Sequence, residues 1–303
     1  MTEAGNRHVP VLFQEVFEFL RVRPGGTYVD CTVGMGGHAE GILRRLGRGG
    51  RLIGFDRDPE ALALAGKRLD QVAAELGSEA PEVRLVGEAF GSIGQHVEPG
   101  SVDGLLADLG VSSLQFDEAR RGFSFQAEGP LDMRMDMRSG PTAEQVVNEV
   151  SEREMADLIY EFGEERRSRT VARAIVRGRP VTTTEQLARI VASVVPPMKG
   201  HRIHPATRTF QALRIYVNRE LEEIRALFEA APQLLKPSAR LAVISFHSLE
   251  DRIAKDSLRE GAAKGIWKIL TKKPVTASQE EEEMNPRSRS AKLRAAERTA
   301  IGF

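Results

Sequence analysis

The sequence contains almost no cysteine and no long apolar run. Cys31 is the only cysteine among 303 residues, so an internal disulfide and every zinc site built from several cysteines are excluded. No segment approaches the run of about 18 apolar residues that a membrane-spanning helix needs, and the amino terminus shows no secretory signal pattern. We therefore expect a cytoplasmic protein without a structural metal and without a membrane contact.

A net charge is also lacking, because 43 basic residues balance 43 acidic residues. The total charge therefore does not indicate nucleic-acid binding. The distribution is uneven, since residues 164–219 contain twelve Lys or Arg and only three Glu. This segment could face phosphate groups, or its charges could lie on solvated helix faces.

The first part of the chain alternates short β-type runs with helical stretches. Strands are expected at 27–31, 51–55, 83–86 and 102–107, with helices at 37–46 and 59–76. This alternation predicts a parallel sheet covered by helices, which is a Rossmann-like α/β core. It stops after Asp108, and strand-like sequence returns only at 240–246. The interval is therefore predicted to be an insertion.

The insertion is predicted to be mainly helical. Three capping-box spacings open helical stretches, namely Thr142 with Gln145, Ser151 with Glu154, and Thr183 with Gln186. A longer helix is expected to begin near His204, with apolar residues at three- or four-residue spacing as far as Leu227.

These patterns predict two domains. A discontinuous α/β core is placed at 1–115 and 220–303, and an inserted, helical substrate-binding domain at 116–219. Near the end, the acidic run 280–283 precedes five basic residues between Arg287 and Arg298. This stretch is predicted to be a loop and a basic tail outside the core.

The strongest local signal is a glycine-rich turn that joins a strand to a helix, Asp30-Cys-Thr-Val-Gly34-Met-Gly36-Gly37-His38. Glycines let the backbone approach a ligand, and free N–H groups at a helix start favour a carboxylate or phosphate. S-adenosylmethionine would fit, because the Asp30 carboxylate could pair with its cationic part, whereas the same carboxylate would repel a pyrophosphate. Gly34, Gly36 and Ala39 also match a dinucleotide fingerprint, so a nicotinamide enzyme remains an alternative.

Two further residues support an adenosine ligand. Asp56 ends the second strand, twenty positions after Gly36, where a carboxylate can accept hydrogen bonds from both ribose hydroxyls. Phe90 follows the third strand, where its ring could pack against an adenine or belong to the core.

A polar segment follows the fourth strand, Asp108-Leu-Gly-Val-Ser112-Ser113-Leu-Gln115. The carboxyl edge of an open α/β sheet is where ligands bind. Methylation of an exocyclic base amine needs acceptors that hold the N–H bonds and align nitrogen, methyl and sulfur. Asp108 and Ser112 are the predicted catalytic residues. Alternatively, Asp108 caps the next segment and the serines form a turn.

Aromatic and polar side chains further along are candidates for substrate binding. The candidates are Phe123, Phe125, Arg134, His204, Arg208 and His247. A base could stack on either Phe, or both rings could anchor their loop to the core.

Two other chemistries are rejected. Ser245, His247 and Asp251 have the residue types of a hydrolase triad, but they lack the glycine-flanked serine turn and lie too close in sequence. His201 and His204 lack a third metal ligand at useful spacing.

Together the motifs resemble the bacterial 16S ribosomal RNA cytosine N4-methyltransferases, the RsmH or MraW family. The resemblance covers nearly the whole chain and rests on His8 to Leu12, Asp30 to His38, Gly54 to Pro59, Asp108 to Ser113, Arg121 to Asp136, His204 to Arg214, Ser245 to Arg252 and Asn285 to Arg289. It implies a class I S-adenosylmethionine-dependent methyltransferase fold interrupted by a helical domain. The segment from Lys264 to Glu283 is shorter than in some family members.

The resemblance also implies an activity and a site. A methyl group would pass from S-adenosylmethionine to N4 of a cytidine, position 1402 in the family's RNA numbering, within 16S ribosomal RNA of the small subunit. S-adenosylhomocysteine would be the product. Motif matching places cofactor contacts on Gly36, Gly37, His38, Asp56, Phe90, Asp108 and Gln115. The remaining alternatives are a DNA amino-methyltransferase and a non-catalytic RNA-binding assembly factor.

Overall fold

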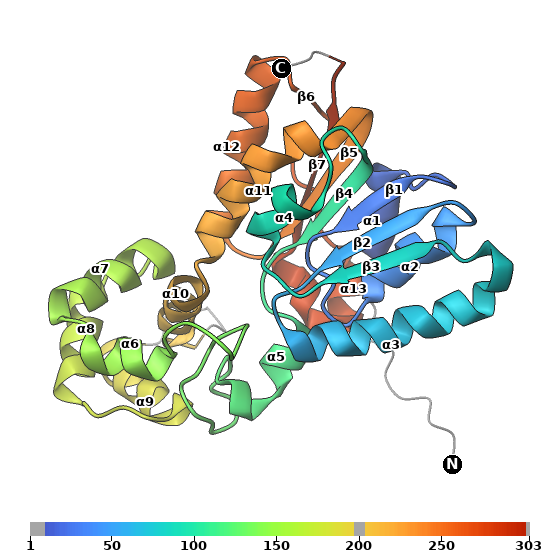
Figure 1. Ribbon diagram of the computed structural model, residues 1–303. Helices are drawn as coiled ribbons and strands as arrows, with labels where there is room; N and C mark the ends of the chain where they lie inside the picture. Colours follow the sequence, from blue (N-terminus) through green and yellow to red (C-terminus); the bar gives the residue numbers. More distant parts are fainter. Residues whose placement is uncertain (1–9, 197–203, 301–303) are drawn as a thin grey trace. The chain divides into compact units, whose positions relative to one another are not determined.

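The computed structural model describes residues 10–196 and 204–300, which form two compact units. The sheet unit consists of residues 10–110 and 221–300, and the helical unit consists of residues 111–196 and 204–220. Figure 1 labels the elements of both. Several residues from the sequence analysis lie outside the described residues, namely His8 and Val9 of the first motif, His201 of the rejected metal site, and the basic residues Lys199 and Arg202.

The sheet unit contains one seven-stranded sheet with the order β3-β2-β1-β4-β5-β7-β6. In chain order the strands are β1 Thr27–Asp30, β2 Arg51–Phe55, β3 Glu82–Val86, β4 Val102–Asp108, β5 Leu235–Ser245, β6 Trp267–Ile269 and β7 Lys292–Arg298. β1 to β5 run parallel, and β7 runs antiparallel to both its neighbours. The strand order reverses between β1 and β4, which is where open α/β sheets bind ligands at their carboxyl ends. The predicted Rossmann-like fold is confirmed.

The helices of the sheet unit follow the predicted βα alternation. They are α1 Phe13–Leu20, α2 Gly37–Leu46, α3 Pro59–Leu76, α4 Ile93–His96, α11 Glu220–Leu234, α12 Ser248–Ala263 and α13 Gln279–Met284. The predicted bounds of α2 and α3 are confirmed. Helix α3 begins where it does because Asp58 accepts the Glu60 N–H at 3.0 Å and Pro59 occupies the first turn. No helix among the described residues is long and apolar enough to span a membrane.

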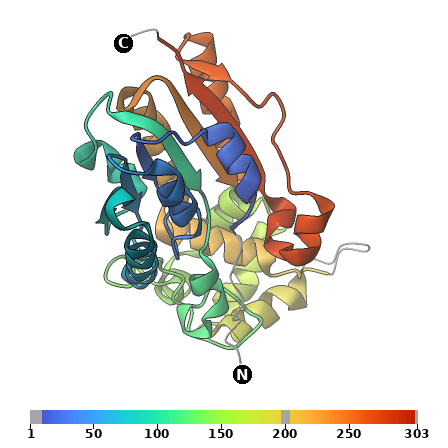
Figure 2. The ribbon, with the colours of Figure 1, turned by 90° about the vertical axis from the view of Figure 1, so that its right-hand side faces the viewer.

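The prediction of a loop and basic tail after residue 280 is wrong. The acidic run lies in α13, and β7 lies between β5 and β6 within the sheet (Figure 2, red). Two buried arginines of β7 have specific partners. Arg294 Nε donates to Asp251 Oδ1 at 2.7 Å, and Arg298 Nε donates to the Pro232 carbonyl at 3.0 Å. A charged sequence can occupy an interior strand when each charge is paired, and spacing along the chain does not reveal that pairing.

The helical unit contains α5 Ser113–Asp117, α6 Ala143–Glu149, α7 Glu152–Gly163, α8 Ser168–Arg177, α9 Thr184–Val194 and α10 Thr207–Asn218. The three predicted capping boxes open α6, α7 and α9. The prediction of a single helix from His204 to Leu227 is wrong, because the helix is interrupted at Arg219, between α10 and α11. Arg219 has a φ of 51°, in the left-handed region that ends a helix.

Candidate active site

Three carboxylates lie at the carboxyl ends of neighbouring strands. Asp30 ends β1, Asp108 ends β4, and Asp56 directly follows β2. β1 lies between the other two strands, with Asp30 in register with Gly54 on one side and Leu106 on the other. The parallel register therefore gathers the three predicted site residues at one edge of the sheet, beside the switch in strand order.

Asp56 holds the glycine turn that connects β1 to α2. Its Oδ2 accepts the Gly34 N–H at 2.8 Å, and its Oδ1 accepts the Asp58 N–H at 2.9 Å. Gly34 and Gly36 have φ angles of 53° and 83°, which glycine adopts without strain. Asp56 thus has a structural role that the sequence did not indicate, and its predicted contact with a ribose stays a prediction.

Two of the carboxylates each have an oxygen without a donor. Asp30 Oδ2 and Asp108 Oδ1 are buried and accept no hydrogen bond from any described residue. Burial, reinforced by the charge of Asp56 and opposed by hydrogen bonds from Thr32, raises the pKa of Asp30 to about 7. Burial, with the charges of Asp30 and Glu250, raises the pKa of Asp108 well above its ordinary range. Such groups are typical of places where a ligand supplies the missing partner.

These features fit S-adenosylmethionine. Its cationic groups would compensate the buried carboxylates of Asp30 and Asp108, and its carboxylate would suit the N–H groups at the start of α2. The glycines there are required by packing as well as by φ. A Cβ on Gly37 would lie only 2.5 Å from Pro10 Cγ, so a larger residue would push the chain around Pro10 away from the turn.

His38 lies in the first turn of α2 and contacts Asp108. The His38 Nε2 atom is 3.6 Å from Asp108 Oδ2, and the imidazole is buried. On its other side the ring stacks on Phe13, with centroids 5.9 Å apart. The family resemblance alone pointed to His38, and the structure places it against the predicted catalytic carboxylate.

Phe90 begins a short 3₁₀ turn after β3 and is half-buried. The next residue is fixed from a distant helix, because Gly91 N–H donates to Glu223 Oε2 of α11 at 2.7 Å. The position is compatible with packing against an adenine, and that contact stays a prediction.

His247 caps the amino end of α12, directly after β5. Its Nδ1 accepts the Glu250 N–H at 3.4 Å, and its Nε2 lies 3.2 Å from Glu250 Oε1. The second oxygen of Glu250 accepts the Phe246 N–H at 2.8 Å. Both ring nitrogens of His247 therefore lie close to Glu250 in the first turn of α12, which favours a capping role over contact with substrate. Glu250 was not singled out from the sequence, although its spacing from His247 is that of a capping box.

Ser112 and Gln115 belong to the helical unit and cap α5. The Ser112 hydroxyl accepts the Gln115 N–H at 3.3 Å, and the Gln115 side-chain oxygen accepts the Ser112 N–H at 3.1 Å. This geometry matches the turn alternative for Ser112. Its catalytic role and the cofactor contact of Gln115 stay predictions.

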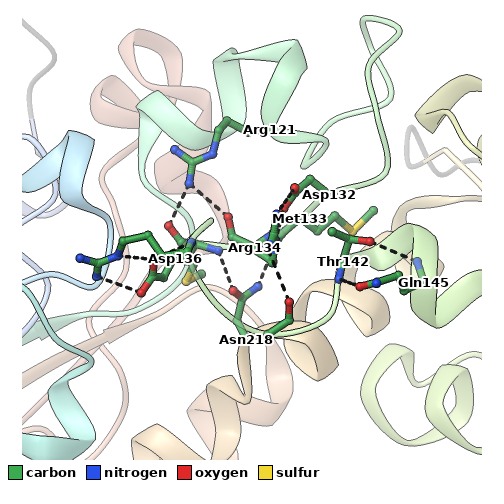
Figure 3. Close-up of polar contacts among 11 residues, drawn as sticks. Arg121, Asp132, Met133, Arg134, Asp136, Thr142, Gln145 and Asn218 are labelled. Carbon is green, nitrogen blue, oxygen red and sulfur yellow. Dashed lines mark hydrogen bonds and ion pairs between the residues drawn. The ribbon is translucent and has the colours of Figure 1, made fainter.

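Loop 131–136, which contains the substrate-binding candidate Arg134, is held by two residues for which the sequence predicted no such role. Asn218 Oδ1 accepts the Met135 N–H at 2.7 Å, and its Nδ2 donates to the Met133 carbonyl at 2.8 Å (Figure 3). The buried Arg121 donates to the carbonyls of Arg134 and Met135 at 3.1 and 2.9 Å. The loop is therefore fixed through its backbone.

The Arg134 side chain, a candidate for substrate binding, is paired within this loop. Its Nε and Nη2 donate to the two oxygens of Asp132 at 2.9 and 2.8 Å (Figure 3). A substrate phosphate would compete with Asp132 for this guanidinium group.

Asn218→Ala should destabilise loop 131–136. The substitution leaves the buried Met135 N–H without an acceptor, which costs about 1–3 kcal/mol. Faster hydrogen exchange at the Met135 amide and a lower midpoint of chemical unfolding are expected. Asn148→Ala is the matched control, because the Asn148 side chain brackets the backbone of Val181 in the same way. Unchanged exchange at Met135 in Asn218→Ala would contradict the assignment.

The two candidate phenylalanines differ in exposure. Phe123 is buried in the core cluster of the helical unit, which favours the anchoring alternative for this ring. Phe125 is half-buried, with its centroid 4.7 Å from exposed His204 and 4.9 Å from Phe210. Arg208, one turn beyond His204, donates to the Glu164 carbonyl at 3.1 Å. Phe125, His204 and Arg208 therefore stay available as surface groups.

Comparisons with known proteins agree with the motifs. The model of the MraW methylase family matches residues 5–299. A protein of Acidobacterium capsulatum named ribosomal RNA small subunit methyltransferase H is 66% identical, over 96% of this chain and 98% of that protein. A protein of Koribacter versatilis with the same name is 58% identical, over 96% of this chain and 94% of that protein.

The comparison with solved structures gives a match that is more distant in sequence. A putative rRNA methylase from Clostridium thermocellum is 14% identical, with a TM-score of 0.45 over 96% of this chain and 94% of that one. The assignment therefore rests on the family model and the close relatives, which cover nearly the whole chain. The chain belongs to the MraW methylase family and is an S-adenosylmethionine-dependent methyltransferase with a Rossmann-like core.

Proposed function

We propose that this protein transfers a methyl group from S-adenosylmethionine to N4 of a cytidine in 16S ribosomal RNA, position 1402 in the family's RNA numbering, within the small ribosomal subunit in the cytoplasm. Family membership and the names of the close relatives support ribosomal RNA as the substrate. The observation that carries the proposal is the pair of buried carboxylates at the switch point of the sheet, Asp30 and Asp108, each with one oxygen that lacks a donor.

Asp108 is suited to hold and deprotonate an exocyclic amine. Bound S-adenosylmethionine supplies a methyl group on a positively charged sulfur. Asp108 Oδ1 can accept a hydrogen bond from an N–H group of the amine and so keep the nitrogen oriented, while Asp108 Oδ2 faces His38. Because burial raises the pKa of Asp108, its carboxylate is also a stronger proton acceptor than an ordinary aspartate. It can take up the proton that the methylated nitrogen releases.

Asp30 is assigned to cofactor binding. It is almost fully buried, and one of its oxygens already accepts the Thr32 N–H at 3.1 Å. The other oxygen would meet the cationic part of the ligand. Gly34, Gly36 and Gly37 keep the backbone of the turn open to the carboxylate end, and Phe90 is the candidate contact for the adenine.

The helical unit is assigned to substrate binding. It contains most of the basic segment found in the sequence and the aromatic pair of Phe125 and His204. A local basic surface can bind RNA phosphates even when the whole protein is neutral, because counterion release depends on the charges in contact. Shape recognition within a ribosomal particle supplies further specificity.

Methyl transfer to small ribosomal subunits that lack this modification tests the proposal. Labelled S-adenosylmethionine and nucleoside mass spectrometry should reveal N4-methylcytidine with the wild-type protein and none with Asp108→Ala. Transfer to duplex DNA but not to particles or RNA would favour a DNA amino-methyltransferase. Tight cofactor binding with no transfer to any nucleic acid would favour the non-catalytic assembly factor.

A further inference from the structure

Most exposed arginines of the helical unit face an acidic side chain. Arg153 lies 3.9 Å from Asp157 and Arg189 lies 3.8 Å from Glu185, both one helical turn apart. Arg173 lies 3.4 Å from Glu152. Such pairs are common on solvated helix faces and indicate no ligand.

Four exposed arginines differ, because they form no ion pair with any described residue. They are Arg166, Arg167, Arg169 and Arg177. All four fall within twelve consecutive positions, in the turn before α8 and on α8 itself. These four exposed arginines of the described part of the helical unit therefore lie close together in the sequence.

Helix α8 carries two of these four arginines, Arg169 and Arg177, in line with Arg173, which pairs with Glu152. Arg169, Arg173 and Arg177 are spaced four residues apart, which places them on one face at steps of about 6 Å along the axis. The buried side chains of α8 include Val171, Ala172 and Ile175 on the other side. The three guanidinium groups, here called the arginine row, point away from the core of the unit.

An aromatic pair is connected to the turn before this row. Phe125 and His204 pack at 4.7 Å, and His204 precedes the first turn of α10. From that helix Arg208 donates to the Glu164 carbonyl and lies 3.8 Å from Glu165 in the turn between α7 and α8. These contacts link the aromatic pair, Arg208 and the start of α8 within the helical unit.

We propose that the arginine row binds the phosphates of a single-stranded RNA segment beside the target cytidine, and that His204 and Phe125 stack on an unpaired base of that segment. The inference rests on the proposed function and adds the contact surface and the strand state of the substrate. Guanidinium groups that track a backbone, together with aromatic rings for bases, are typical of single-strand binding. A continuous RNA duplex offers phosphates but no unstacked base.

Binding of a fluorescent single-stranded RNA oligonucleotide across a salt series tests the arginine row. R169Q/R177Q removes two positive charges, and R153Q/R189Q is the matched control with the same charge change on paired arginines of the same unit. The slope of log affinity against log salt should become shallower by about 1.4 in R169Q/R177Q, because each lost phosphate contact contributes about 0.7. R169K/R177K should restore the slope.

His204→Asn tests the aromatic pair separately. Asparagine keeps an acceptor at the position where His204 Nδ1 accepts the Ala206 N–H at 3.2 Å, and it removes the ring. The affinity for single-stranded RNA should fall about five- to a hundred-fold with an unchanged salt slope, as expected for loss of one stacked base.

Several outcomes would overturn the inference. An equal loss of RNA affinity in R169Q/R177Q and R153Q/R189Q would show that the arginine row contributes only general electrostatic attraction. Equal affinity for a duplex of the same sequence, with an equal loss in R169Q/R177Q, would assign the row to duplex RNA. Wild-type methyl transfer with unchanged RNA binding in R169Q/R177Q would refute the row and leave the proposed function intact. Cofactor binding without transfer by the wild type would refute the proposed function instead.

Discussion

Asp108→Asn should lower the rate of methyl transfer by about 100- to 1,000-fold, the usual cost of losing one preorganised polar group at a reacting centre. The amide keeps the size of the side chain but removes its negative charge and its capacity to take a proton. Ligand-free stability should be equal to or higher than that of the wild type at pH 8. Burial penalises the ionised carboxylate, and that penalty disappears with the charge.

Single-turnover transfer at saturating cofactor is the appropriate measurement, since it isolates the chemical step from product release. Asp103→Asn is a matched control at the opposite end of β4. The Asp103 carboxylate accepts the Thr27 N–H at 2.8 Å and pairs with Lys236 at 2.7 Å, away from the carboxyl edge of the sheet. This control should lose stability and keep the single-turnover rate. A near wild-type rate in Asp108→Asn would remove Asp108 from the reaction.

The parts of the fold that were predictable from the sequence are those with local signals. The bounds of α2 and α3 follow from glycines, a proline and an Asp cap that lie within or beside each helix. The three site carboxylates were found because each stands at the end of a short apolar run. Strand ends in a parallel sheet meet at one edge, so local positions became a spatial prediction.

The missed features depend on contacts between distant residues. Strand β7 is charged along its sequence, and the pairing of its charges, including Arg294 with Asp251 and Arg298 with a carbonyl of α11, makes it compatible with the sheet interior. Asn218 and Arg121 hold loop 131–136 across separations of 83 and 14 residues. The pKa of Asp30 is raised by burial and the charge of Asp56, and the pKa of Asp108 is raised by burial and the charges of Asp30 and Glu250. A single sequence shows the side chains but not this burial or pairing.

The affinity for S-adenosylmethionine should increase with pH up to about 7, and Asp30→Asn should reduce both the affinity and this dependence. Burial raises the pKa of Asp30 to about 7, so below that pH the ligand-free protein holds a proton that a cationic ligand must displace. Each pH unit below 7 should therefore weaken binding by up to about tenfold. Loss of a buried charge pair costs about 2–5 kcal/mol, which corresponds to a decrease of at least about 30-fold in the variant at pH 8.

Stability without ligand should change in the opposite direction. Between about pH 4 and 7 the folded protein keeps a proton on Asp30 that the unfolded chain has released, so the free energy of unfolding falls as pH rises. In Asp30→Asn the free energy of unfolding should decrease less steeply with pH over this range. Asp56, whose pKa burial raises to about 6, titrates in the same range. The difference in pH dependence between wild type and variant reports Asp30 together with its electrostatic coupling to Asp56 and Asp108.

Calorimetry in buffers of different ionisation enthalpy would measure both the affinity and the protons released on binding. Proton release near pH 6 that is smaller in Asp30→Asn supports the assignment, and equal release in both proteins contradicts it. S-adenosylhomocysteine keeps the ammonium group and lacks the charge on sulfur. An equal pH dependence for the two ligands would therefore place Asp30 against the ammonium group, whereas a weaker dependence for S-adenosylhomocysteine would place it against the sulfonium centre.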